Sequence, residues 1–200
     1  PRESTVRIGL VVQRYGEGIT GGSESLARAV AERLAGEQRI TVFTTCARDY
    51  VTWRNELPEG LVRLAGVDVL RFRVEEERDL AAFNAFAEPL YARERTHEEE
   101  IEFLRRQGPH APRLVEAIRA ERDRFAAVVF FTYLYSPTYW GLAAAPERAA
   151  LVPTTHDEPP LRFGIYREVF ARPRAFGFLT PAEEALVRRR FDVRGRPCVL

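Results

Sequence analysis

The chain contains no lysine and no methionine, and only two of its 200 residues are cysteine. Without lysine it cannot form a Walker A phosphate loop, which uses a lysine to reach the phosphates. Cys46 and Cys198 lie far apart in the sequence and form no CxxC motif. This cysteine usage argues against a zinc site or a disulfide scaffold, and it fits a reducing cytoplasm.

Long hydrophobic runs and an excess of one charge are also absent. No stretch approaches the ~18 apolar residues of a membrane span, so we expect no transmembrane segment. The segment PRESTVRIG enters the first apolar run without a signal peptide. The 30 basic residues, all arginine, are interleaved with 29 acids, for a formal net charge of +1. That balance predicts no nucleic-acid partner. We expect a cytoplasmic protein, with a peripheral position at the inner face of the membrane also compatible.

Residues 6–36, VRIGLVVQRYGEGITGGSESLARAVAERLAG, have the pattern of a strand, a glycine-rich loop and a helix. The short apolar run RIGLVV is typical of a central parallel strand. Leu26, Val30 and Leu34 recur at a spacing of four, which predicts an amphipathic helix. Gly36 is expected to end that helix in the left-handed conformation. The chain therefore opens with a strand–loop–helix unit around which the rest is organised.

The loop of this unit is a candidate anion site. Gly21 and Gly22 stand where side chains would keep a ligand from the backbone, and Ser23 is expected to cap the helix. The first amide groups of a helix point toward its N-terminus and favour negative charge. This helix start is therefore expected to contact a phosphate group or a sugar.

The rest of the chain alternates apolar strands with helices. Strands are expected at 39–45, 67–74, 126–134, 149–155 and 175–179, with Val199 and Leu200 beginning another. Residues 75–124 are expected to be mostly helical, with a capping box at Thr96 and Glu99 and a second helix that begins at Pro112. Further helices are expected at 136–142 and 180–191. Such alternation predicts one α/β domain over residues 1–200. We expect a doubly wound, Rossmann-like and mainly parallel sheet of six to seven strands, with helices on both faces.

Two segments of this pattern carry finer expectations. Residues 46–66 combine aromatic and turn residues and are expected to be a structured surface loop without a strand. In the strand that follows, Leu70 and Phe72 alternate with Arg71, so the arginine face should meet solvent near a sheet edge.

Candidate functional residues follow several of the expected strands. In doubly wound sheets, ligands bind outside the carboxyl ends of the strands. Three groups fall there. They are the glycine loop, the tyrosines Tyr133 and Tyr135, and an acidic segment with a histidine, His156, Asp157 and Glu158. We expect these groups to share one rim. The other two histidines, His97 and His110, lie in charged or proline-flanked stretches typical of a solvated surface.

Two other classes of function remain open at this point. The spacing of Gly16, Gly18 and Gly21 satisfies GxGxxG, which is found in nicotinamide-dependent oxidoreductases. Such an enzyme needs an acid at the end of the second strand, where this chain has Thr44, Thr45 and Cys46. A noncatalytic α/β binding module is the other alternative. No metal is expected, because too few histidines and cysteines accompany His156 to form a ligand shell.

Several longer motifs resemble a known family. They are GGSES before the first helix, CARDYVTWRNELPEG, RQGP, FFTYLYSPTYWG and VPTTHDEPPL. Together they resemble the N-terminal domain of the group 1, family 4 glycosyltransferases, which have the two-domain GT-B fold, and the longer motifs are similar to one bacterial branch. The resemblance covers essentially the whole chain.

The resemblance implies transfer of a sugar from a nucleotide-diphosphate sugar to a glycan, lipid or small-molecule acceptor, with retention at the anomeric carbon and no cofactor. It implies that His156 is catalytic and lies against the donor sugar. It assigns the donor phosphate or sugar to Gly21, Gly22 and Ser23. From the residues themselves, we expect Tyr15, Tyr133, Tyr135, Asp157 and Glu158 at the acceptor site or the cleft rim.

In this family the N-terminal domain mainly holds the acceptor, and a C-terminal domain with a pair of glutamates holds the nucleotide. The 200 residues stop before such a domain. We therefore expect the chain to fold as the acceptor-side half, with its own C-terminal domain as a partner, and to be inactive alone.

Overall fold

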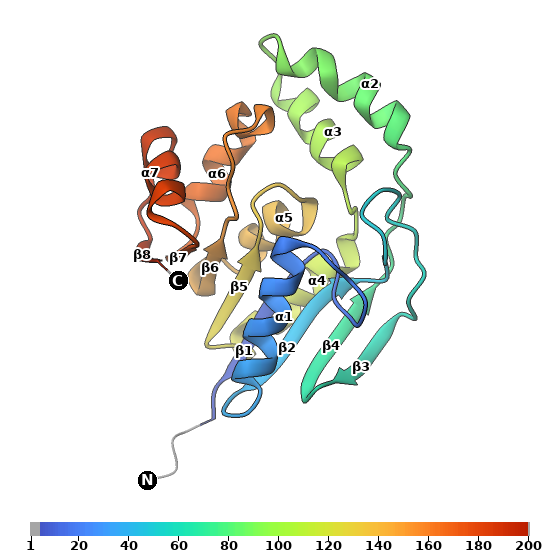
Figure 1. Ribbon diagram of the computed structural model, residues 1–200, viewed down its shortest axis with the longest axis vertical. Helices are drawn as coiled ribbons and strands as arrows, with labels where there is room; N and C mark the ends of the chain where they lie inside the picture. The colour runs from blue at the N-terminus through green and yellow to red at the C-terminus, as the bar shows by residue number, and fades with distance from the viewer. Residues whose placement is uncertain (1–4, 200) are drawn as a thin grey trace.

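The computed structural model describes residues 5–199, which form a mainly parallel, eight-stranded sheet with helices on both faces (Figure 1). The strands are β1 (Arg7–Val11), β2 (Arg39–Thr45), β3 (Gly60–Leu64), β4 (Val67–Phe72), β5 (Ala127–Phe131), β6 (Ala149–Val152), β7 (Ala175–Phe178) and β8 (Arg196–Val199). The α-helices are α1 (Gly22–Leu34), α2 (Leu80–Tyr91), α3 (His97–Gln107), α4 (Pro112–Glu121), α5 (Ser136–Ala144), α6 (Ile165–Ala171) and α7 (Pro181–Arg190). Short 3-10 helices are η1 (Arg122–Arg124), η2 (Pro146–Arg148) and η3 (Pro159–Arg162).

The strand order, β3-β4-β2-β1-β5-β6-β7-β8, confirms the doubly wound α/β class. From β1 the chain moves outward through β2 to β4, then returns to place β5 on the other side of β1. From there it continues outward through β6, β7 and β8. The loops after β1 and β5 therefore leave the sheet in opposite directions. A crevice between them is the usual ligand site of such folds.

Two hydrophobic clusters fill the faces of the sheet. On one face, α1 packs on the strands through Ala27 and Ala31, both fully buried. On the other face, α4 and α5 lie behind the sheet in the larger cluster (Figure 1). The expected stripe of Leu26, Val30 and Leu34 is only partly buried, because the face of α1 that meets the strands carries Ala27 and Ala31. Helix α1 ends at Leu34 without a left-handed residue, so the role expected of Gly36 was wrong.

Strand β3, which the expected pattern did not include, lies within residues 46–66, the segment expected to be a loop. It pairs antiparallel with β4 at the edge of the sheet, through a hairpin turn at Ala65 and Gly66. Both turn residues have positive φ, 47° and 82°. Such a turn usually carries Asn-Gly or Asp-Gly, so the Ala-Gly sequence gave no hairpin signal. The strand itself is only half-buried, as expected at an edge.

Two further expectations about strands were also wrong. In β4 the buried face carries Val67, Val69 and Arg71, so the face of this arginine is covered and not solvated. Burial lowers the pKa of the Arg71 guanidinium. Strand β8 begins at Arg196, before the expected start at Val199. Leu200, the other residue of that expectation, lies outside the described residues. Helix α6, which follows β6, had no counterpart in the expected pattern.

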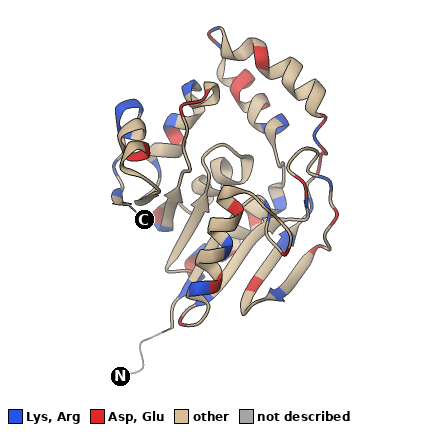
Figure 2. Ribbon diagram, in the orientation of Figure 1, with Lys and Arg blue, Asp and Glu red and all other residues tan. Residues whose placement is uncertain are grey.

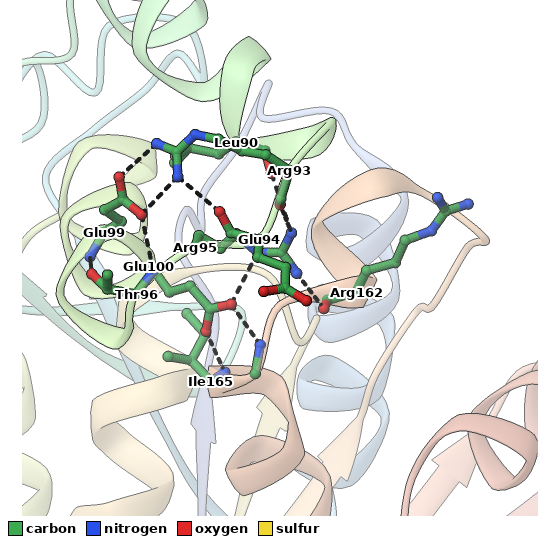
Figure 3. Close-up of polar contacts among 10 residues, drawn as sticks. Leu90, Arg93, Glu94, Arg95, Thr96, Glu99, Glu100, Arg162 and Ile165 are labelled. Atoms are coloured by element: carbon green, nitrogen blue, oxygen red, sulfur yellow. Dashed lines mark hydrogen bonds and ion pairs between the residues drawn. The ribbon is translucent and has the colours of Figure 1, made fainter.

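A buried carboxylate helps to attach the α2–α3 hairpin to the segment after β6 (Figure 3). The capping box of Thr96 and Glu99 starts α3 as expected. One turn in, Glu100 is only 5% exposed and accepts hydrogen bonds from the backbone N–H groups of Gly164 and Ile165, at 2.8 and 2.9 Å. Arg95 donates to the same carboxylate at 3.0 Å. Glu100 therefore acts as the cap of α6, from outside that helix.

Replacing Glu100 tests this attachment. We expect Glu100→Gln to lower the free energy of unfolding by about 2–4 kcal/mol, because it leaves a largely buried arginine without its counter-charge. Chemical denaturation of the purified chain measures this loss. The matched control is Glu98→Gln, an exposed residue in the first turn of the same helix. Equal stability of the two variants would contradict the role of Glu100.

Candidate functional site

A pocket of about 520 Å³ lies at the carboxyl ends of β1, β5 and β6, where the chain changes direction in the sheet. Its size is in the range typical of small-molecule sites. It is lined by Gln13, Arg14, Thr20, Gly21, Gly22, Ser23, Glu24, Leu26, Tyr50, Thr132, Leu134, Tyr135, Thr154, His156, Glu158 and Leu179. The start of α1 thus lies in the same pocket as the loops after β5 and β6.

A buried ion pair holds the start of α1 against the end of β1. Arg14 and Glu24, 5% and 6% exposed, are joined by a 2.6 Å contact between Nη2 and Oε1. The same guanidinium donates to the carbonyls of Thr20 and Arg48 and lies over the ring of Tyr50. Neither residue was singled out from the sequence, because a charged pair gives no sign of its burial there.

Ser23 does not cap α1, which corrects the expectation from the sequence. The N-cap residue is Gly21, and no side chain caps the helix. The Ser23 hydroxyl instead donates to Oε2 of Glu24 at 2.9 Å and accepts from Nε2 of Gln13 at 3.1 Å. With no side-chain cap on α1, the first amides of the helix are open to a ligand on the pocket side.

The two glycines of this helix start have different surroundings. Gly21 has φ 156°, and a Cβ atom there would lie 2.3 Å from Oε2 of Glu24. A Cβ atom on Gly22 would meet no atom within 4 Å. The shape of the protein therefore requires glycine at position 21, whereas only a bound ligand would require it at position 22. Gly16 and Gly18, the other glycines of the GxGxxG match, do not line the pocket.

The loop after β6 brings His156 and Glu158 into the pocket. His156 is exposed, while Glu158 is half-buried and accepts a hydrogen bond from the hydroxyl of Tyr133 at 2.7 Å. Burial, with Glu158 next in effect, raises the pKa of Tyr133 well above its usual value. Tyr133 is only 1% exposed and packs on Tyr166, so it supports the pocket wall from the core.

Asp157 points into a neighbouring hollow and not into the main pocket. That hollow, of about 340 Å³, shares Thr154, His156 and Leu179 with the main pocket, so the two are continuous. The Asp157 carboxylate accepts from Arg190 of α7 at 3.0 Å. This places Asp157 beside the rim with its charge already paired.

A buried glutamate fixes the backbone of the histidine loop. Glu183 of α7 accepts from the backbone N–H of Thr155 at 2.6 Å and from that of Leu179 at 2.7 Å. The expected Thr180–Glu183 capping box is therefore half formed: Thr180 caps the amide of Glu183, but the Glu183 carboxylate is used elsewhere. The position of His156 next to Thr155 thus depends on α7.

The remaining aromatic candidates divide between pocket and core. Tyr135 lines the pocket and packs edge-on against Trp53, with ring centroids 5.4 Å apart. Tyr50 lies at the pocket and is 58% exposed. Tyr15 is 2% exposed and belongs to the α1 cluster, and burial raises its pKa to about 12. The structure therefore places Tyr15 away from the pocket.

The end of β2 bears on the nicotinamide alternative. Thr44, Thr45 and Cys46 are completely buried, and the Thr45 hydroxyl donates to the carbonyl of Gln13 at 2.6 Å. No carboxylate stands at this position to bind ribose hydroxyls. In the part of the chain that the structure describes, no cluster of three or more His, Cys, Asp or Glu side chains could hold a metal. None of its helices is long and apolar enough to cross a membrane.

Fold and pocket together define a Rossmann-like α/β domain with a ligand-sized site at its switch point. No family model matches the chain, and no curated protein matches its sequence. Among solved structures, the fold is similar to that of a sucrose-phosphate synthase from Thermosynechococcus elongatus. The TM-score is 0.57 and the identity 15%, with 96% of this chain and 87% of the other covered. At this identity the similarity shows the fold alone.

The two glycines make a matched pair of variants for stability. We expect Gly21→Ala to destabilise the chain by about 2 kcal/mol or more, because its methyl group would collide with the Glu24 carboxylate in a strained backbone conformation. Gly22→Ala should change stability by less than about 1 kcal/mol, since the site is open and helical. Thermal unfolding of both variants decides the matter. Equal losses would show that the two glycines are not distinguished as described.

Proposed function

We propose that the chain is the acceptor-side domain of a retaining glycosyltransferase that uses a nucleotide-diphosphate sugar. The observation that carries the proposal is one pocket that combines an uncapped helix start at Gly22 with His156 at the switch point of the sheet. The motif resemblance to family 4 glycosyltransferases supports it. So does the structural similarity to a sucrose-phosphate synthase, which has the GT-B fold.

The charges in the pocket support a site that is completed by a second domain. Arg14 is the one arginine in its lining, and its charge is neutralised by Glu24, while Glu158 adds a further negative charge. A diphosphate needs more positive charge than this lining provides. The nucleotide would therefore be held by a donor domain across the cleft, and this chain would contribute the backbone amides of Gly22 and its neighbours.

In this proposal the residues of the chain act mainly by position. The amides at the start of α1 would stabilise negative charge as it develops on the leaving diphosphate. The imidazole of His156 would hydrogen-bond a hydroxyl of the donor sugar and orient its anomeric carbon. In a transfer on one face of the sugar, the leaving phosphate accepts the proton of the attacking hydroxyl. A free pair of carboxylates, which hydrolases use, is then not required.

The same charges favour an uncharged, hydroxyl-rich acceptor. The Glu158 carboxylate, half-buried and already accepting from Tyr133, can accept a further hydrogen bond from an acceptor hydroxyl. Tyr135 and the exposed ring of Tyr50 offer flat apolar surfaces for a sugar ring. An acceptor with its own phosphate would meet Glu24 and Glu158 without an unpaired arginine in the lining.

A noncatalytic binding module is the alternative that the same pocket allows. It would use the polar lining to hold a sugar and would need neither His156 nor Gly22 in particular. The nicotinamide alternative is disfavoured by the buried threonines at the end of β2, and absence of NADH binding in a fluorescence titration would dismiss it.

Activity of the protein that includes the donor domain tests the proposal. With a panel of nucleotide-diphosphate sugars, nucleoside diphosphate release should depend on an added acceptor, and the 200-residue chain alone should release none. His156→Ala should lower kcat at least about tenfold, because it removes a hydrogen bond made at the reacting sugar. Gly22→Ala should lower kcat/KM for the donor while leaving the melting temperature unchanged.

His97→Ala is the control, since this exposed histidine lies on α3, away from the pocket. Transfer at an unchanged rate by the His156→Ala protein would show that this domain only binds a substrate, which would favour the binding module. Turnover by the 200-residue chain without a partner domain would contradict the division of the site between two domains.

A further inference from the structure

A second polar hollow, of about 530 Å³, lies at the amino ends of β7 and β8. The pocket described above lies at the carboxyl ends of the strands. Its lining contains no acidic residue and four arginines, namely Arg172, Arg174, Arg194 and Arg196. Figure 2 shows acidic and basic residues interleaved along many of the helices. A lining with charges of one sign only is therefore unusual in this protein.

The backbone of the sheet brings these arginines together. The N–H of Arg174 donates to the carbonyl of Ala149 at 2.8 Å, and the N–H of Arg196 donates to the carbonyl of Arg174 at 2.9 Å. The loop before β8 also lies against the loop before β7, because a Cβ atom on Gly195 would be 2.6 Å from the carbonyl oxygen of Pro173. The starts of β7 and β8 are thereby held side by side, and residues of both line the hollow.

Only half of the positive charge at the hollow is neutralised. Arg172 is paired with Glu168, and Arg194 with Asp192 at 2.8 Å. Arg174 and Arg196 are exposed, and neither has a carboxylate within ion-pair distance among residues 5–199. The hollow therefore carries a net charge of about +2 at the starts of two adjacent strands.

The guanidinium group of Arg172 is held by residues that do not line the hollow. The Nη1 atom of Arg172 is buried and has no hydrogen-bond acceptor in the described part of the chain. Its Nη2 atom is held by Glu168, and its guanidinium lies over the ring of Tyr139 at 5.7 Å from the centroid. Arg172 is therefore fixed in orientation, and it forms a wall of the hollow without offering a free donor to it.

We propose that this hollow binds a phosphate group through Arg174 and Arg196, with Arg172 and Arg194 as its walls. The guanidinium group matches phosphate oxygens with paired donors. A volume of about 530 Å³ exceeds one phosphate ion and accommodates a diphosphate or a phospholipid headgroup. The site lies at the amino ends of the strands, whereas His156 follows the carboxyl end of β6. It is therefore not the donor site of the proposed transferase.

Binding of inorganic pyrophosphate to the 200-residue chain, measured by calorimetry at low salt, tests the site. We expect saturable binding that the double variant Arg174→Gln/Arg196→Gln weakens at least about tenfold, since it removes both unpaired charges from the lining. Both residues are exposed and have no side-chain partner, so the variant should keep its melting temperature. The control, Arg33→Gln/Arg189→Gln, removes the same charge from exposed positions on α1 and α7 and should bind normally.

Vesicles distinguish the source of the phosphate. If the ligand is a lipid headgroup, vesicles of phosphatidylserine and phosphatidylcholine should co-sediment the wild-type chain, and phosphatidylcholine alone should not. If it is a soluble phosphate compound, pyrophosphate should bind and neither vesicle should. Absence of binding to both probes would overturn the proposal, and so would equal losses in the variant and the control. These outcomes do not depend on the proposed transferase activity.

Discussion

The buried ion pair between Arg14 and Glu24 is the interaction on which the site depends. It joins the loop after β1 to the first turn of α1, and it also holds the carbonyls of Thr20 and Arg48 and the ring of Tyr50. Removing one partner would leave a buried charge without compensation, which is far costlier than losing a surface pair. The pair also explains Gly21, because its carboxylate occupies the space of a side chain there.

Carboxylates position the opposite rim in a similar way. Glu183 holds the backbone next to His156, Glu100 holds the segment that leads into α6, and Glu158 and Asp157 are engaged by Tyr133 and Arg190. These acids thus serve in part as hydrogen-bond acceptors that fix loops. A site whose carboxylates are already engaged in this way is better suited to orienting a substrate than to acid–base hydrolysis, in agreement with the proposed transfer.

Much of the fold followed from local pattern. Apolar runs gave the parallel strands, and the proline and capping residues gave the starts of α3, α4 and α7 close to their observed positions. The pattern failed at β3, where the turn uses Ala65 at positive φ. It failed at Arg71 because a polar residue in alternation with apolar ones normally faces solvent. Here the loop after β1 covers that face, and the Arg71 guanidinium lies 3.4 Å from where a Cβ atom of Gly16 would stand.

The sequence by itself determined the strand–loop–helix opening, the doubly wound class and the set of loops that reach the carboxyl edge of the sheet. These features depend on periodicity and on neighbours within a few residues. Only the tertiary structure decided that Gly22 is the open glycine, that Tyr15 and Tyr133 belong to the core, and that Arg14 is neutralised. Burial and charge pairing arise between residues brought together by the fold, so no local pattern can specify them.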